Sequence, residues 1–180
     1  YLGALFGAFA TIGAPRAHAQ FANACGGTDF FSCAILRIAG QGTSTLKFTV
    51  TNVSNRARAN NPNSVFKEFG VGNRSLAGSA TVTPTGAASS RFPVSGTRAL
   101  SFSGAGYTPS NYFGLDAKSP APTNGLHNGE SVSFLVTFAT VGDANGFLTG
   151  LQLAIDDIGG LTRSCGSNKA VFDANGHPAS

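Results

Sequence analysis

Two segments of this sequence alternate apolar and polar residues so strictly that they admit one kind of local structure. In segment 131–141 every second residue from 132 to 138 is apolar, namely Val132, Phe134, Val136 and Phe138. Segment 43–51 repeats the pattern with Leu46, Phe48 and Val50. Because successive side chains of a strand point to opposite faces, each segment predicts a half-buried strand of an antiparallel sheet. The apolar faces of both strands are expected to line one core.

The remaining apolar segments are short and are bounded by Gly, Pro or Ser, as strands joined by turns are. They cover residues 65–71, 80–83, 99–102, 112–115, 151–155 and 169–172. The first of them departs from alternation, which predicts a bulge or bend near Gly70. Residues 83–98 and 116–129 have the Pro, Gly and Ser content of loops, and no helical spacing of apolar residues follows Gln20. These patterns predict an all-β fold: a single antiparallel β-sandwich, Ig-like or jelly-roll-like, of about eight or nine strands.

The first 19 residues predict an export signal. Residues 1–14 form an uncharged apolar run, Pro15 follows, and Ala17-His18-Ala19 fits an A-x-A cleavage site. The run is shorter than the about 20 residues of a membrane span, so cleavage is expected rather than a transmembrane anchor. Because no Met and no basic segment precede the run, we expect the sequence to begin inside a longer precursor. The mature chain, residues 20–180, is then one secreted domain, extracellular or on a bacterial cell surface.

The small net charge speaks against a nucleic-acid partner. Without Arg16, 11 basic and 8 acidic residues remain, a net charge of +3. Arg56 and Arg58 are close in sequence, but no run of Lys and Arg with interleaved aromatic residues surrounds them. Both are therefore interpreted as solvated loop residues.

Three cysteines, Cys25, Cys33 and Cys165, would enter an oxidising compartment on export. An odd number predicts one disulfide and one remaining thiol. Cys25 and Cys33 enclose a Gly-rich segment that can turn sharply, so a local bridge between them is the first expectation, with Cys165 as the free thiol. A bridge from Cys165 to either of the other two is the alternative, and the sequence leaves the three connectivities open.

A repeated tetrapeptide is the candidate for metal binding. The residues 143–146, Asp-Ala-Asn-Gly, recur at 173–176. Oxygen atoms of these repeats suit Ca²⁺, and the candidate ligands are Asp143, Asn145, Asp173 and Asn175. The segments lack the further acidic ligands of a dedicated calcium loop, and Asn-Gly is a tight-turn signal. We therefore interpret both as structural turns, expect no cofactor, and keep calcium as the alternative.

The sequence carries no recognisable enzyme signature. Asp156 and Asp157 are adjacent, so on a strand they face opposite sides and cannot serve one catalytic centre. His127 and His177 lack metal-ligand spacing, and no G-x-S-x-G motif occurs. We expect a protein without enzymatic activity, and an extracellular hydrolase is a remote alternative.

Sugar binding is the closer alternative. Tyr107, Asn111 and Tyr112 could form a small polar and aromatic patch of the kind that stacks on sugars. The Phe residues mostly occupy inward positions and are assigned to the core. We interpret the segment that holds the two tyrosines as a loop packed on the sheet edge, with a lectin-like module as the alternative.

Two stretches resemble a known group of exported proteins. The first is LKFTVTNVS at 46–54, followed by SVFKEFG at 64–70, and the second is GLHNGESVSF at 125–134. Together they resemble the secreted bacterial β-sandwich proteins of the PEP-CTERM type, which are sorted by exosortases. The resemblance covers about residues 43–141, while the Pro-Glu-Pro sorting signal itself is not in this sequence. It implies a non-catalytic structural or adhesive protein whose partners are cell-surface or matrix polymers.

Overall fold

A computed structural model describes residues 17–24, 30–54, 62–76, 79–93, 111–158 and 169–173, and the structural statements below concern those residues. In chain order the elements are β1 (Ala17–Ala24), β2 (Phe30–Ala39), β3 (Thr45–Asn52), β4 (Val65–Gly72), β5 (Ala80–Thr85), η1 (Ala87–Ser90), β6 (Tyr112–Asp116), α1 (Ala121–Asn124), β7 (Leu126–His127), β8 (Ser131–Phe138), α2 (Val141–Thr149), β9 (Gln152–Asp157) and β10 (Lys169–Phe172).

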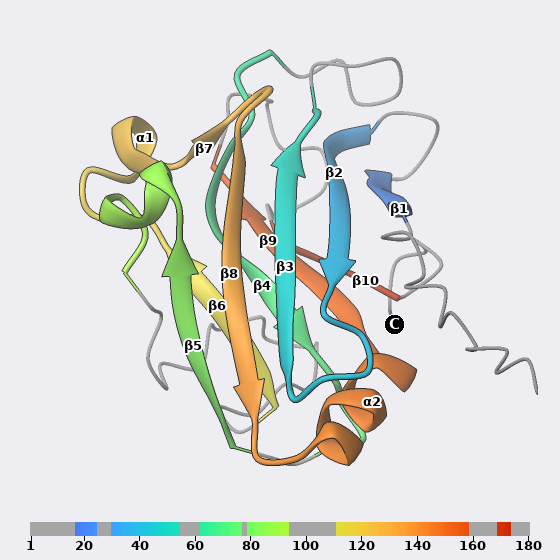
Figure 1. Ribbon diagram of the computed structural model, residues 1–180. Helices are drawn as coiled ribbons and strands as arrows, with labels where there is room; N and C mark the ends of the chain where they lie inside the picture. The colour runs from blue at the N-terminus through green and yellow to red at the C-terminus, as the bar shows by residue number, and fades with distance from the viewer. Residues whose placement is uncertain are drawn as a thin grey trace, which may run out of the picture.

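The strands form two antiparallel sheets (Figure 1). The first sheet has the strand order β1, β2, β3, β8, β5. The second has the order β10, β9, β4, β6, with the short β7 beside β4. In the view of Figure 1, β4, β6 and β9 pass behind the first sheet. The prediction of an all-β fold is confirmed.

The phase of the two alternating segments is also confirmed. β3 lies beside β8 in the first sheet, with Phe48 directly opposite Phe134. Both phenylalanines are fully buried, and their rings stack with centroids 5.6 Å apart. The other predicted inward residues of the two strands are buried as well: Leu46, Val50, Val132, Val136 and Phe138. Strict alternation therefore identified the buried face of both strands.

Inward side chains of the second sheet belong to the same apolar cluster as those of the first. They include Phe69, Val71, Leu115, Leu153, Ile155 and Phe172. At one end of the cluster Phe113 of β6, Phe138 of β8 and Phe147 of α2 contact one another, with ring centroids 5.1 to 5.7 Å apart. Side chains from both sheets and from α2 thus share one core.

The irregularity expected near Gly70 lies earlier in the strand. The register of β4 against β9 shifts between Phe66 and Glu68, whereas Gly70 pairs regularly with Gly114 and Ala154. Phe66 and Phe69 are three positions apart, a spacing that would place them on opposite faces of a regular strand. The bulge permits both to be buried in the same core.

The expectation that no helix follows Gln20 is wrong. The long strand ends at Phe138, and α2 occupies residues 141–149, so the tetrapeptide at 143–146 lies in a helix and not in a tight turn. Thr140 and Asp143 form a capping box, in which each side chain accepts a hydrogen bond from the other's backbone N–H at 3.1 Å. Two shorter pieces, α1 and η1, lie in segments that the sequence predicted to be loops.

The N-terminal strands β1 and β2 precede the first strand predicted from alternation. The expected cleavage position after Ala19 falls inside β1, where Ala17 pairs with Arg37. Residues 1–16 and the predicted strand 99–102 lie outside the described residues. Within the described part of the chain, none of the helices has the length and hydrophobicity needed to cross a membrane.

Candidate functional site

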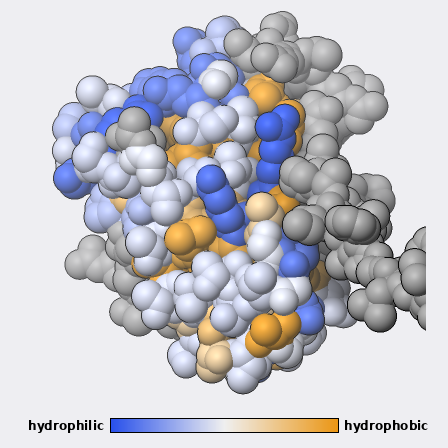
Figure 2. All heavy atoms as spheres, viewed as in Figure 1, coloured by the Kyte–Doolittle hydropathy of each residue, from blue (hydrophilic) through white to orange (hydrophobic). Residues whose placement is uncertain are grey.

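The broadest candidate surface is the outer face of the first sheet. The alternation that buries one side of β3, β8 and β5 turns the intervening residues outward, and most of these carry hydroxyl groups. They are Thr45, Thr49, Thr51, Ser131, Ser133, Thr137, Thr81, Thr83 and Thr85. We call this set the hydroxyl face. Figure 2 looks onto this side of the molecule, where pale residues of intermediate hydropathy cover much of the surface.

Hydroxyl groups of β3 and β8 bond to one another across the strands. The pairs are Thr45 with Thr137 at 3.1 Å, Thr49 with Ser133 at 2.8 Å, and Thr51 with Ser131 at 2.7 Å. A hydroxyl offers one donor and two acceptor positions, so each pair consumes one O–H and leaves the second O–H and further acceptor positions available. The hydroxyl face is therefore an ordered array of short groups that can still bind a polar ligand.

Two exposed cations extend from the same side of the sheet. Arg37 of β2 lies opposite Thr49, and Lys47 precedes Thr49 by two residues on β3, so the two cations are diagonal neighbours. Leu135 lies between Lys47 and Thr83 in one cross-strand row and is half-buried. None of the five strands of the first sheet contains an Asp or Glu residue.

Acidic residues gather on the second sheet instead. Glu68 of β4 lies between Asp116 of β6 and Asp156 of β9 in one cross-strand row, which Lys169 of β10 extends. Their chain neighbours point into the core, so this row lies on the outer face of the sheet. Glu68 and Asp156 are each 5 % exposed, and at that exposure neither carboxylate can contact a dissolved polymer.

The sequence did not reveal this row, because its members are far apart in the chain and only the strand order brings them together. It did predict that Asp156 and Asp157 face opposite sides, and this is confirmed. Asp157 accepts hydrogen bonds from the Ser64 hydroxyl at 2.6 Å and from the Val65 backbone N–H at 3.0 Å, within a buried network. The Asp157 carboxylate thus joins β9 to the start of β4.

The residues expected to stack on a sugar are largely buried where they are described. Asn111 is 4 % exposed and Tyr112 is 8 % exposed. The Tyr112 ring lies over Gly114 of its own strand and Gly70 of β4, where any Cβ would collide with its hydroxyl. Tyr107 lies outside the described residues, so the patch of Tyr107, Asn111 and Tyr112 stays a prediction.

Of the calcium candidates, Asp143 has a structural role that accounts for its carboxylate. Its Oδ2 atom accepts hydrogen bonds from the backbone N–H and the hydroxyl of Thr140, at 3.1 and 2.8 Å. Asn145 is exposed on α2, Asp173 follows β10, and Asn175 lies outside the described residues. Among the residues that the structure describes, no group of three or more His, Cys, Asp or Glu side chains is arranged to hold a metal ion.

Cys33, one half of the expected disulfide, lies on β2 and is fully buried with Val53, next to Ile35. Its backbone N–H donates to the Ser54 hydroxyl at 2.9 Å. Cys25 and Cys165 lie outside the described residues, so the bridge between Cys25 and Cys33 and the odd thiol at Cys165 stay predictions.

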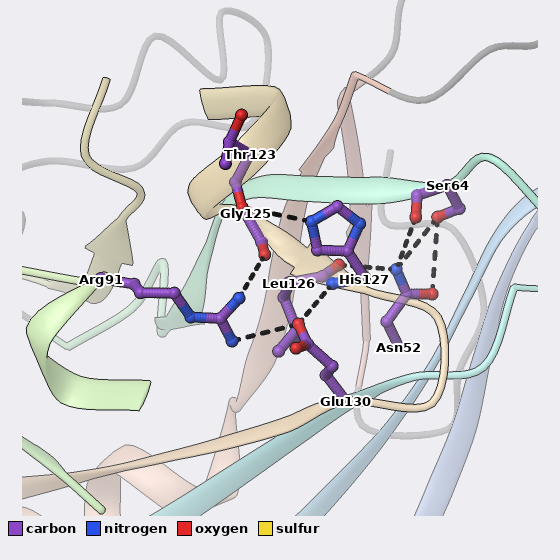
Figure 3. A network of polar contacts seen from close by, with 8 residues as sticks. All are labelled: Asn52, Ser64, Arg91, Thr123, Gly125, Leu126, His127 and Glu130. Carbon is purple, nitrogen blue, oxygen red and sulfur yellow. Dashed lines mark hydrogen bonds and ion pairs between the residues drawn. The ribbon is translucent and has the colours of Figure 1, made fainter. Parts of the chain in front are cut away.

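A polar cluster at one end of the sheets is shown in Figure 3. Arg91 donates to Glu130 at 3.1 Å and to the carbonyl of Gly125 at 3.3 Å, and Glu130 also accepts the backbone N–H of His127 at 2.9 Å. Asn52 donates to the carbonyl of Leu126 at 2.9 Å and to Ser64. These contacts connect the turn before β8 to Arg91, directly after η1, and to Asn52 at the end of β3. They stabilise the fold, and the exposed candidate site is therefore the hydroxyl face.

The chain matches no protein-family model, no curated protein and no solved structure.

Proposed function

We propose that this protein is a non-catalytic structural or adhesive protein of the bacterial exterior, and that its two sheets, which hold ten strands in the described part of the chain, form one β-sandwich. The observation that supports an adhesive role is the hydroxyl face. It extends over β3, β8 and β5 as an array of exposed and half-buried hydroxyl groups, interrupted by Lys47 and Leu135 and in part fixed by cross-strand hydrogen bonds. Such a surface suits a broad contact with an extended polymer better than it suits a reaction centre.

The disposition of the buried polar groups supports a role without catalysis. Asp157, Asn52 and Ser64 bond to one another or to backbone groups, as buried polar groups of a structural network do. A reaction centre requires reactive groups that substrate can reach, whereas Glu68 and Asp156 are almost completely buried. The proposal includes export with cleavage after Ala19 and a surface or matrix location of the PEP-CTERM type.

Co-sedimentation of the full chain with insoluble polysaccharides, neutral and uronate-bearing, tests the adhesive role. The double variant Thr49→Val/Thr137→Val removes two hydroxyl groups of the hydroxyl face and keeps the shape of the side chains. We expect it to bind about tenfold more weakly than the unchanged protein, because hydrogen bonds to the polymer are lost. Thr123→Val/Thr149→Val, at exposed positions of α1 and α2, is the matched control and should bind as the unchanged protein does.

The same incubations should release no soluble sugar, which separates adhesion from hydrolysis. Binding to no polymer, or equal binding by Thr49→Val/Thr137→Val, would refute adhesion through the hydroxyl face. Release of soluble product would refute the non-catalytic assignment.

A further inference from the structure

The two cations beside the hydroxyl face have no counter-charge within the described part of the chain. Arg91 and Glu130 form an ion pair, whereas neither Arg37 nor Lys47 contacts a carboxylate in the part of the chain that the structure describes. Glu130 immediately precedes β8, but its carboxylate is taken by Arg91 at 3.1 Å. Diagonal neighbours of like charge on a sheet repel, so an anionic partner would stabilise this arrangement.

The hydroxyl pairs add a second requirement on the partner. Each pair has a spare O–H and spare acceptor positions, so a partner that presents many hydroxyl groups can both donate to and accept from the face. Leu135, between Lys47 and Thr83, supplies an apolar spot against which the C–H side of a sugar ring can pack. Hydroxyl groups next to C–H surface are characteristic of sugars.

The width of the surface indicates a partner of several units. A row that runs from β2 through β3 and β8 to β5 crosses three gaps between strands, about 14 Å in all. A single sugar would cover only part of that row. An extended chain could contact the cations on β2 and β3 and the hydroxyl groups on β8 and β5 at the same time.

From these observations we infer that the hydroxyl face, with Arg37 and Lys47, binds an acidic polysaccharide, a sugar polymer that carries carboxylate groups. The inference rests on the proposed adhesive function and adds the chemical class of the ligand. The guanidinium of Arg37 and the ammonium of Lys47 bind the carboxylates, while the threonine and serine hydroxyls bind the sugar hydroxyls.

Affinity electrophoresis of the full chain in polygalacturonate, with dextran as the neutral polymer, tests the inference. The double variant Arg37→Gln/Lys47→Gln removes both cations from the face. We expect it to lose about tenfold or more in affinity for polygalacturonate, because two charge-assisted contacts are lost. The charge-conserving pair Arg37→Lys/Lys47→Arg should keep most of the affinity.

The control is Arg74→Gln/Lys118→Gln, which removes the same charge from exposed positions off the first sheet. It should change the affinity by less than about twofold, since neither residue belongs to the strands that carry the hydroxyl face. Circular dichroism of each variant verifies that it is folded. The single variants Arg37→Gln and Lys47→Gln should each lose an intermediate amount of affinity for polygalacturonate if both cations bind the ligand.

The outcomes separate the ligand class from the adhesive function. If dextran binds as well as polygalacturonate and Thr49→Val/Thr137→Val weakens both, adhesion stands and the acidic ligand is refuted. If both double variants weaken polygalacturonate equally, or if single-stranded DNA binds as tightly at the same salt concentration, net charge alone is responsible and the inference is overturned. If neither polymer binds, the adhesive function and the inference fall together.

Discussion

Phe134 and Thr137 lie on the same strand and on opposite faces of it. Phe134 is fully buried against Phe48, whereas Thr137 is exposed and bonds to the Thr45 hydroxyl at 3.1 Å. Removing the Phe134 ring leaves a cavity that the surrounding core can only partly fill. Removing the Thr137 hydroxyl costs one hydrogen bond that water can replace. The two residues therefore give a matched test of the strand phase.

We expect Phe134→Ala to lower the free energy of unfolding by about 3–5 kcal/mol. Thr137→Ala should change it by no more than about 0.5 kcal/mol, as exposed substitutions usually do. Urea unfolding of both variants measures the two values. A harmless Phe134→Ala together with a severe Thr137→Ala would mean that the strand faces the other way.

At this scale the sequence was informative where alternation was strict and misleading where it was not. The outward position of Thr49 and Thr137 followed directly from the pattern of their neighbours. The residues 65–71 lack such a pattern, because a bulge between Phe66 and Glu68 shifts the faces, whereas the bulge was expected near Gly70. The burial of Tyr112 over Gly70 was likewise not predictable, since it depends on which strand lies beside β6.

The helix α2 shows how a short element depends on its ends. It contains Gly142 and Gly146, which have poor helix propensity, and it has nine residues, so its own backbone bonds give it little stability. The capping box of Thr140 and Asp143 begins it. At its other end, the Asn73 side chain donates to the carbonyls of Gly146 and Phe147 at 3.3 and 2.9 Å. The Thr-x-x-Asp spacing was present in the sequence, but the Asn-Gly pair inside the helix suggested a turn.

Thr140→Ala should lower the free energy of unfolding by about 1 kcal/mol, because it removes the hydroxyl that accepts the Asp143 N–H. Thr140→Ser keeps that hydroxyl and should be close to neutral. Chemical denaturation of both variants tests the cap. Equal losses for alanine and serine would show that the methyl group of Thr140, and not its hydroxyl, is what stabilises the start of α2.

At the scale of the whole molecule, the main apolar cluster of the described residues joins both sheets and α2. Neither sheet can bury its inward side chains without the other, so we expect one cooperative unfolding transition. Far-ultraviolet circular dichroism and tyrosine fluorescence should report the same denaturation midpoint. Two separate midpoints would indicate that the sheets unfold independently.

The pairing of strands distant in sequence limits what the chain alone can predict at this scale. β5 lies beside β8, and β4 beside β9, and no local pattern encodes either neighbour. The outward hydroxyl groups could be predicted from alternation, but the approach of Arg37 to Lys47 could not, because it requires β2 to lie beside β3. The class of fold was therefore accessible from the sequence, and only part of the candidate site was.

The charges on the strands themselves are distributed unequally between the two sheets. The strands of the first sheet carry Arg37 and Lys47 and no acidic residue, while those of the second carry four acidic residues against two lysines. In the field of a negatively charged surface this difference between the strands favours an approach with the first sheet forward. This electrostatic effect reaches about 10 Å at 0.1 M salt and about 30 Å at 0.01 M, so the approach should be most strongly oriented in dilute water.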